Sequence, residues 1–388
     1  MISDTTGAAS WSSGYDARRL AMSSTILLTG VTGFLGGALA PRLVATDQTV
    51  VALVRGENIQ QATARMIRSL SRFVGPMAAE AAASSTKVIV GDLTSREVYD
   101  RPELEAVTHV VHAAGCTSFA SEREVWRSNV DGTRCLAERM HRSAGLRRFL
   151  HVSTAYCCGD RPNAIVHEDD APREEHGHVN EYTRSKAAAE LLLGSMSWGE
   201  RLVIARPSIV IGDTALGVEP SSSLFWYYRA LAALRCGPFV LDDRRDIVPV
   251  DYVADALAFL LMLERPKFGT YNVSAGTEAS QPLGEILQRL VPAELETNAA
   301  EWRRVSASAL AEMRGAIRGL VRDEKEARKL ARGLGACAKF GELGVQCFDN
   351  GRLLSEGFRA PPRFTDYAAT CLRTSAGATI CDQMIDDA

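Results

Sequence analysis

The sequence lacks a CxxC pair, a long hydrophobic run and a marked excess of charge of one sign. Its nine cysteines have no regular spacing, which argues against a disulfide framework and is typical of small core residues in a reducing compartment. The longest apolar stretches, such as 256–263, hold fewer than half of the roughly 20 residues that a bilayer-spanning helix needs. We therefore expect a cytoplasmic protein without an integral membrane segment.

Charge and ligand chemistry exclude two further classes of partner. The chain has 44 Lys and Arg residues against 47 Asp and Glu residues, so it has no general attraction to nucleic acid. Glu174, Glu175, His176 and His178 could be metal ligands, but their segment has the composition of a loop and no second ligand cluster. We predict neither a nucleic-acid partner nor a metal site.

The composition is that of a folded globular chain. It has 388 residues, of which 46% are hydrophobic and 23% charged. At about 150 residues per domain, this length favours two to three domains. Residues 1–22 are rich in Ser, Thr, Gly and Ala, so we expect a disordered N-terminal extension, with Met22 as an alternative start to Met1.

The order of elements predicts a doubly wound α/β fold. Continuous Val, Ile and Leu runs are typical of parallel strands that helices cover on both faces, and helix-like stretches separate them here. We expect a Rossmann domain at 23–212, and a smaller substrate-binding and helical part at 213–388 that interleaves with it up to about 275. The predicted strands lie at 26–28, 50–54, 88–90, 109–112, 149–153 and 202–205.

A glycine-rich turn follows the first predicted strand and precedes a helix-like run. Gly30, Gly33 and Gly36 form a GxxGxxG pattern in which missing Cβ atoms let a pyrophosphate approach backbone N–H groups at the helix N-terminus. An ordinary tight turn could have the same glycines, but the strand–turn–helix context favours dinucleotide binding. The residues predicted to bind there are Gly30, Thr32, Gly33, Phe34, Leu35 and Gly36.

The second strand ends in Arg55 rather than in the acidic residue that usually binds the ribose of NAD. A guanidinium can pair with a 2′-phosphate, so NADP(H) is the expected cofactor unless Arg55 is only a solvated surface residue. Asp92 and Leu93 follow the third strand and fit a contact to the adenine, although an Asx turn would give the same pattern.

Three residues have the pattern of an acid–base group. Tyr182 and Lys186 are four residues apart among good helix formers, so they share one helix face. A nearby ammonium should lower the pKa of the phenol and make it a usable acid or base. Thr154 lies at the carboxyl end of a predicted strand, where ligands meet parallel sheets.

Together these motifs resemble the extended short-chain dehydrogenase/reductase family over residues 24–275. The resemblance implies that Thr154, Tyr182 and Lys186 act together and that Lys186 also holds the nicotinamide ribose. It further implies that Asn129 has a catalytic or a structural role, of which we favour the structural one. The motifs behind it are the glycine turn, Gly91-Asp92-Leu93, His112 to Gly115, Ser128-Asn129-Val130, Ser153-Thr154, Tyr182 with Lys186, and Arg206-Pro207-Ser208, and the further nucleotide-binding residues implied are Ala113, Ala114, Gly115, Asn129, Tyr182, Lys186, Pro207 and Ser208.

The chain is most similar to the thioester reductase and fatty acyl-CoA reductase branch. The similarity rests on the long segment after the second strand and on Ala113-Ala114-Gly115 leading to Phe119, with weaker likeness at 348–350 and 364–367. It implies that NADPH reduces an acyl thioester, on CoA or on a carrier, to an aldehyde or alcohol. The residues that could cover the acyl chain, or simply form a core helix, are Leu224, Phe225, Trp226, Tyr227 and Leu231.

Other functions remain open at this point. The same site could serve a dehydrogenase or ketoreductase of a sterol-like or polyketide alcohol, or a protein that binds the dinucleotide without turnover. A nucleotide-sugar epimerase or dehydratase would need basic residues, and Arg229, Arg235, Arg244 and Arg245 are available. Residues 301–332 predict an amphipathic helix packed on the domain, or else a docking surface for an acidic carrier or a membrane. By family analogy the protein is at most a homodimer.

Overall fold

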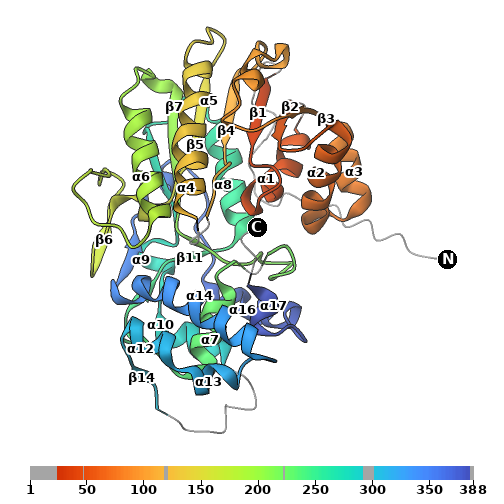
Figure 1. Cartoon of the computed structure of the whole chain (residues 1–388). Coiled ribbons are helices and arrows are strands. Elements are labelled where there is room, and N and C mark those ends of the chain that lie inside the picture. The colour runs from red at the N-terminus through yellow and green to blue at the C-terminus, as the bar shows by residue number, and fades with distance from the viewer. Residues whose placement is uncertain (1–23, 47, 118–120, 222, 292–300, 385–388) are drawn as a thin grey trace, which may run out of the picture.

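The fold is described from a computed structural model, which covers residues 24–46, 48–117, 121–221, 223–291 and 301–384. The predicted N-terminal extension and Phe119 lie outside these residues. In Figure 1 a sheet with flanking helices fills the upper part of the molecule, and a group of helices fills the lower part. Within the described ranges, no helix is both long and apolar enough to cross a bilayer.

The central sheet has seven parallel strands in the order β12-β7-β5-β4-β1-β2-β3. The predicted doubly wound fold is confirmed, because the chain moves outward from β1 in one direction and then crosses back to continue from β4 in the other. The seventh strand, β12, comes from beyond residue 212 and pairs with β7. The strands are β1 Thr25–Thr29, β2 Thr49–Val54, β3 Thr86–Val90, β4 His109–His112, β5 Arg148–Val152, β7 Leu202–Pro207 and β12 Thr270–Val273.

Helices cover both faces of this sheet. One face packs against α1 Phe34–Val44, α2 Ile59–Val74, α3 Pro76–Ser84 and α8 Val250–Met262. The other packs against α5 Gly132–His141 and α6 Glu181–Gly194, with α4 Glu122–Trp126 and the π-helical η3 Arg127–Asp131 beside them. Short 3₁₀ turns lie at η1 Arg96–Asp100, η2 Pro102–Leu104, η4 Ala155–Cys158 and η5 Gly199–Arg201.

The lower part of the molecule has its own hydrophobic core. Its helices are α7 Phe225–Leu234, α10 Leu283–Leu290, α12 Ala307–Glu312, α13 Arg314–Arg318, α14 Glu324–Glu342, α16 Phe364–Thr374 and α17 Ile380–Gln383. Shorter elements connect it to the sheet: β6 Ala164–Val166, β8 Ile209–Val210, β9 Cys236–Gly237, β10 Arg244–Arg245, β11 Ile247–Val248, α9 Gly276–Ala279, β13 Gln281–Pro282, β14 Arg303–Arg304, β15 Gln346–Phe348 and α15 Gly351–Ser355. The predicted division of the chain at residue 212 stays a prediction.

The prediction of one continuous helix at 301–332 is wrong. The structure has α12, α13 and the start of α14 in this range, with a break at Met313, whose backbone is not helical, and another after Gly319. Asp323 starts α14 by accepting a hydrogen bond from the backbone of Glu326. The predicted apolar face does pack inward, since Leu310 and Ile317 are fully buried.

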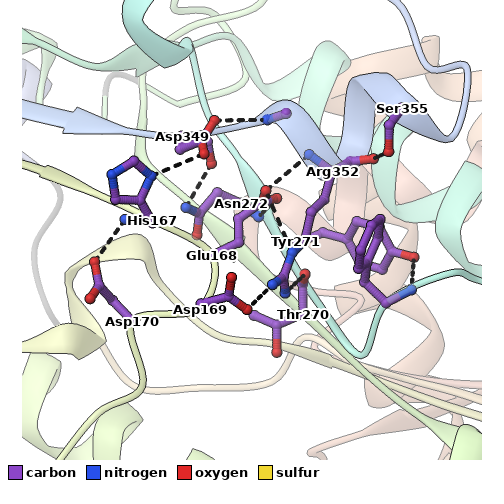
Figure 2. Close-up of polar contacts among 12 residues, drawn as sticks. His167, Glu168, Asp169, Asp170, Thr270, Tyr271, Asn272, Asp349, Arg352 and Ser355 are labelled. Atoms are coloured by element: carbon purple, nitrogen blue, oxygen red, sulfur yellow. Dashed lines mark hydrogen bonds and ion pairs between the residues drawn. The ribbon is translucent and has the colours of Figure 1, made fainter.

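The segment from β15 to α15 fastens the C-terminal region to the outer strand β12 (Figure 2). The Glu168 carboxylate accepts hydrogen bonds from the backbone N–H of Asn272 at 2.9 Å and of Arg352 at 2.9 Å. Arg352 also pairs with Asp169 and stacks its guanidinium 4.8 Å from the ring centre of Phe268. A cavity of about 440 Å³ opens beside these residues. We name Glu168, Asn272 and Arg352 the sheet-edge clasp.

Candidate active site

The glycine turn lies at the carboxyl end of β1, where β1 and β4 are neighbours in the sheet. Gly30 has φ of +80°, and a Cβ at this position would lie 2.6 Å from backbone atoms of Ala113 and Ala114. Two segments that the sequence predicted as cofactor-binding are therefore in direct contact. The sequence could not show this contact, because 83 residues separate Gly30 from Ala113.

The turn fits a dinucleotide pyrophosphate. A Cβ on Gly36 would lie 2.1 Å from the carbonyl oxygen of Gly30, so only glycine allows the helix to start this close to the strand. Gly33 caps α1 without a side-chain hydrogen bond, which leaves the first-turn N–H groups of Phe34, Leu35 and Gly36 without intrahelical acceptors. These N–H groups lie at the positive end of α1, where anions bind.

A buried histidine ties this turn to its neighbours. His112 at the end of β4 has one ring nitrogen 2.8 Å from Thr29 Oγ1 and the other 2.8 Å from Thr133 Oγ1. Thr29 Oγ1 in turn accepts the backbone N–H of Ala114 at 3.2 Å. Burial lowers the pKa of His112 to about 3, so its ring is neutral at physiological pH. The sequence analysis gave His112 no role of its own.

The residues predicted to bind the adenosine end of the nucleotide lie after β2 and β3. Arg55 is exposed directly after β2, and its charge acts on Asp92, which follows β3. Burial opposes the shift, but hydrogen bonds from Thr94 and the charges of Arg127 and Arg55 hold the pKa of Asp92 below its ordinary value. The Asp92 carboxylate accepts the N–H and hydroxyl of Thr94 at 2.9 and 2.6 Å, which is the Asx turn that the pattern left open. The adenine contact of Asp92 and Leu93 stays a prediction.

Arg72 on α2 also reaches the glycine turn, although the sequence analysis missed it. Its guanidinium donates to the Thr32 carbonyl at 3.5 Å and to the Pro220 carbonyl at 3.1 Å. It also donates to Ser69 Oγ at 3.0 Å. Arg72 thus joins α2, the turn and the loop after β8. Since its helical spacing is that of an ordinary surface arginine, no sequence signal marks it.

Thr154, Tyr182 and Lys186 come together at the carboxyl end of β5. Asn180 starts α6 by accepting the backbone N–H of Thr183 at 2.9 Å, which places Tyr182 in the first turn. The phenol of Tyr182 hydrogen bonds with the side chain of Thr154. One turn along, Lys186 Nζ donates to the Val152 carbonyl of β5 at 2.7 Å. The predicted helix face and strand end therefore meet.

The pKa values differ from the sequence expectation in one respect. Burial raises the pKa of Tyr182 to about 12, the Cys157 thiol adds to the rise, and the Thr154 hydrogen bond opposes it. Burial also lowers the pKa of Lys186 to about 8, against the charge of Glu190. The expectation that Lys186 lowers the pKa of Tyr182 is not met, because desolvation dominates here. Tyr182 is therefore a protonated donor at neutral pH.

A buried ion pair lies beneath these residues on the same helix. Glu190, two turns from Tyr182, accepts hydrogen bonds from Arg206 at 2.7 and 3.0 Å, and both side chains are less than 5% exposed. Cys157 donates its thiol to Glu190 at 3.0 Å. The i, i+4, i+8 spacing of Tyr182, Lys186 and Glu190 was a signal in the sequence for this arrangement.

Asn129 and Gly115 lie against α6, the helix that contains Tyr182 and Lys186. Asn129 accepts the N–H of Cys116 at 2.7 Å and donates to the Cys116 carbonyl at 3.0 Å and to Ser185 Oγ at 2.9 Å. Its side chain thus ties the segment after β4 to α6. The choice between a structural and a catalytic role for Asn129 stays a prediction. A Cβ on Gly115 would lie 3.7 Å from Lys186 Nζ, so this segment borders the lysine.

Pro207 ends β7, and Ser208 follows it with its backbone N–H bonded to Val273 at 3.2 Å. Both residues are buried, and they lie at the carboxyl edge of the central sheet, as Thr154 and the glycine turn do.

Three of the four basic residues proposed for a sugar nucleotide donate to backbone carbonyls instead. Arg244 donates to the Thr277 and Ser280 carbonyls, and Arg245 donates to the Gly344 carbonyl at 2.5 Å. Arg229 donates to the Ala378 carbonyl at 3.3 Å. Because these guanidinium groups hold loops together, their presence gives no specific support for a diphosphate site.

The parallel sheet, the glycine turn and the Thr154–Tyr182–Lys186 group are the features of an extended short-chain dehydrogenase/reductase. An NAD-binding family model described as male sterility protein matches residues 28–257. The chain therefore belongs to the male sterility protein family, which confirms the resemblance seen in the sequence and makes a nicotinamide nucleotide its class of cofactor.

Individual relatives agree with this assignment. Fatty acyl-CoA reductase 2 of Mus musculus is 26% identical over 292 residues, covering 63% of this chain and 56% of that protein. Sterol demethylase protein B of Methylococcus capsulatus is 29% identical over 273 residues, covering 69% and 73%. The terminal R domain from the myxalamid PKS-NRPS biosynthetic pathway has the same fold, with a TM-score of 0.74, 23% identity and coverage of 91% and 90%. The chain spans about half the length of the fatty acyl-CoA reductases it matches.

Proposed function

We propose that this protein is an NADPH-dependent reductase that converts an acyl thioester, on CoA or on a carrier, to an aldehyde or alcohol. The observation that carries the proposal is the meeting of Thr154, Tyr182 and Lys186 beside the glycine turn at one edge of the sheet. Relatives named fatty acyl-CoA reductase and the fold shared with an R domain support the choice of a thioester.

The proposed reaction gives the residues of the site separate roles in binding the nucleotide and the substrate. The first-turn N–H groups of α1 would hold the pyrophosphate of a nicotinamide nucleotide, and Lys186, next to Gly115, would bind its ribose. A bound reduced nicotinamide nucleotide supplies a hydride. Thr154 and Tyr182 hydrogen bond the thioester oxygen as the new C–H bond forms and the carbonyl electron pair moves onto that oxygen.

Tyr182 then gives its proton to this oxygen, which yields a hemithioacetal. A raised pKa suits this role, because the phenol is protonated before the reaction. The charge of Lys186 stabilises the phenolate that remains. Breaking of the C–S bond releases the aldehyde and a thiol, while the hydroxyl proton of the hemithioacetal is transferred to the sulfur. Formation of the alcohol would need a second hydride from another reduced nucleotide and a second proton from Tyr182 after it is reprotonated by solvent.

Arg55 supports NADPH as the cofactor. It is an exposed cation at the end of β2, where a carboxylate would bind the ribose hydroxyls of NADH. A 2′-phosphate at this position would pair with the guanidinium.

The test is the variant Tyr182→Phe, which removes the proton donor and little else. We expect nucleotide affinity within about twofold of wild type and a loss of about 10² or more in turnover of an acyl-CoA. Calorimetry gives the affinity, and NADPH absorbance gives the rate. Tyr252→Phe is the control, since Tyr252 is a buried tyrosine of α8 whose hydroxyl bonds the Arg359 carbonyl. Wild-type turnover by Tyr182→Phe would overturn the mechanism.

A second candidate is oxidation or reduction of a sterol-like alcohol or ketone at the same site. It is favoured by the relative named sterol demethylase protein B, of which the chain covers 73%. A panel of acyl-CoA, carrier-bound acyl and sterol substrates separates the two functions. Turnover of sterols without turnover of any thioester would replace the first proposal by this one.

A further inference from the structure

A cation from α2 lies beside the glycine turn without an acidic partner. Within the described part of the chain, the guanidinium of Arg72 donates only to neutral oxygens. These are the carbonyls of Thr32 at 3.5 Å, Ser69 at 3.4 Å and Pro220 at 3.1 Å, and the hydroxyl of Ser69 at 3.0 Å. Partial burial lowers the pKa of Arg72, and no acidic group in the same ranges offsets this effect. A partly desolvated charge without a counterion favours the binding of an anion.

Packing between helices fixes the end of α2 against the start of α1. Phe34, the first residue of α1, stacks on Phe73 of α2 with ring centres 6.1 Å apart. The guanidinium carbon of Arg72 lies 5.9 Å from the centre of the same Phe73 ring. A Cβ on Gly37 would lie 2.7 Å from Ser69 Oγ, so the two helices are in close contact here. The position of Arg72 beside the first turn of α1 therefore depends on side chains of both helices.

The charge of Arg72 is close to the anion-binding end of α1. Thr32, which Arg72 contacts, is two residues before Phe34, so their Cα atoms are at most about 7 Å apart. The first-turn N–H groups of α1 lie at the positive end of the helix. The contact of Arg72 with the Thr32 carbonyl is long, and a phosphate oxygen is a stronger acceptor for a guanidinium than a neutral carbonyl. A pyrophosphate at this turn would therefore meet backbone N–H groups and a guanidinium together.

We propose that Arg72 is a further nucleotide-binding residue, whose charge pairs with the pyrophosphate bound at the start of α1. The inference rests on the proposed function, because it adds a residue to the nucleotide site of that reductase. It assigns the phosphates of NADPH to two cations, with the 2′-phosphate at Arg55 and the pyrophosphate at Arg72. Since NADPH and NADH share the pyrophosphate, Arg72 strengthens the binding of both nucleotides, whereas Arg55 discriminates between them.

Nucleotide fragments test the inference without any turnover. ADP contains the pyrophosphate but no 2′-phosphate, and adenosine 2′-monophosphate contains the 2′-phosphate but no pyrophosphate. We expect Arg72→Gln to weaken the binding of ADP, NADH and NADPH by about five- to tenfold. The affinity for adenosine 2′-monophosphate should stay within about twofold of wild type, because this fragment has no phosphate near Arg72. Calorimetry, or competition against fluorescent NADPH, measures each affinity.

Two further measurements separate the charge of Arg72 from its effect on local structure. The loss of ADP affinity in Arg72→Gln should become smaller in about 0.5 M NaCl, because salt screens a partly exposed ion pair. Arg72→Lys keeps the charge, so it should bind ADP at least about twofold more tightly than Arg72→Gln does. A substitution that only disturbed the glycine turn would show neither effect.

The matched control is Arg68→Gln, which removes the same charge from the same helix. Arg68 is exposed one turn before Arg72, and it makes no hydrogen bond to the glycine turn within the residues that the structure covers. This variant should keep the wild-type affinity for every ligand.

Wild-type affinity of Arg72→Gln for ADP would overturn the inference, as would a loss for adenosine 2′-monophosphate as large as the loss for ADP. The proposed function stands in either case, because Tyr182→Phe and the turnover of acyl-CoA test it separately. A wild-type protein that binds no nicotinamide nucleotide would overturn both.

Discussion

At the scale of the residue, Arg55 is an exposed cation that we expect to determine the preference for NADPH over NADH. Replacing it by Asp removes the partner of a 2′-phosphate and adds an acceptor for ribose hydroxyls. We expect Arg55→Asp to lower affinity for NADPH by at least tenfold and to leave or improve affinity for NADH. Fluorescence titration of both nucleotides measures the ratio.

Lys87→Asp is the control for this charge reversal. Lys87 is exposed on β3 toward the amino end of the strand, where it pairs with Val51, whereas Val90 at the carboxyl end pairs with Val54 next to Arg55. The control should keep the wild-type ratio of affinities. The same ratio in Arg55→Asp would show that Arg55 is only a solvated surface residue.

The sequence predicted which residues meet at the site better than it predicted their pKa values. Spacing of four residues places Tyr182 and Lys186 on one face of α6, as expected. The degree of burial, however, depends on α4, η4 and β5, which come from other parts of the chain. Since burial controls the pKa of both groups, the rise to about 12 at Tyr182 could not be inferred from spacing.

At the scale of the element, the start of α1 depends on Gly36, because a side chain at this position would clash with the backbone that follows β1. In Gly36→Ala the new Cβ would lie 2.1 Å from the Gly30 carbonyl oxygen and 2.9 Å from Val31 Cα, which are backbone atoms. We expect a loss of about 1–3 kcal/mol in the free energy of unfolding and at least tenfold weaker nucleotide binding. Urea unfolding and calorimetry measure the two effects.

Gly194→Ala provides the comparison, because Gly194 is the last residue of α6 and a Cβ there would have no neighbour within 4 Å. It should be neutral or stabilise the protein by less than about 1 kcal/mol. If Gly36→Ala behaved like Gly194→Ala, the turn would have to be more open than it is in this structure.

The sequence predicted the long strands of the fold more accurately than the two-residue strands. Six of the seven strands of the main sheet were predicted to within a few residues, because continuous apolar runs such as 50–54 mark buried parallel strands, but β12 was not predicted. The strand Cys236–Gly237 was also missed, and it pairs with Arg303 and Arg304. Two-residue strands depend on distant partners, so no local pattern marks them.

At the scale of the whole molecule, the sheet-edge clasp makes stability depend on pH. Burial raises the pKa of Glu168 to about 7; the N–H groups of Arg352 and Asn272 oppose the rise, and Asp349 adds to it. Between the ordinary value of 4.5 and about 7, the folded protein therefore binds a proton that the unfolded chain does not. We expect the free energy of unfolding to fall as pH rises through this window, by on the order of 1 kcal/mol from this residue.

Urea unfolding at pH 5 and pH 7.5 measures this dependence. Glu168→Gln cannot titrate, so its stability should change less between the two conditions. Asp169→Asn is the control, because Asp169 also pairs with Arg352 but has a side chain that is 89% exposed. An equal pH dependence in wild type and Glu168→Gln would show that other groups cause it.

The sheet-edge clasp also bears on the tendency of the protein to aggregate. Outer strands of a sheet invite aggregation, because their unpaired backbone groups can capture a strand from another molecule. On β12 the Asn272 N–H is taken by Glu168 and the Thr270 carbonyl by Arg352, and β3 at the opposite end presents the charged Lys87. Glu168 and Arg352, which anchor the C-terminal segment, thus also hinder the pairing of β12 with a strand from another copy of the protein.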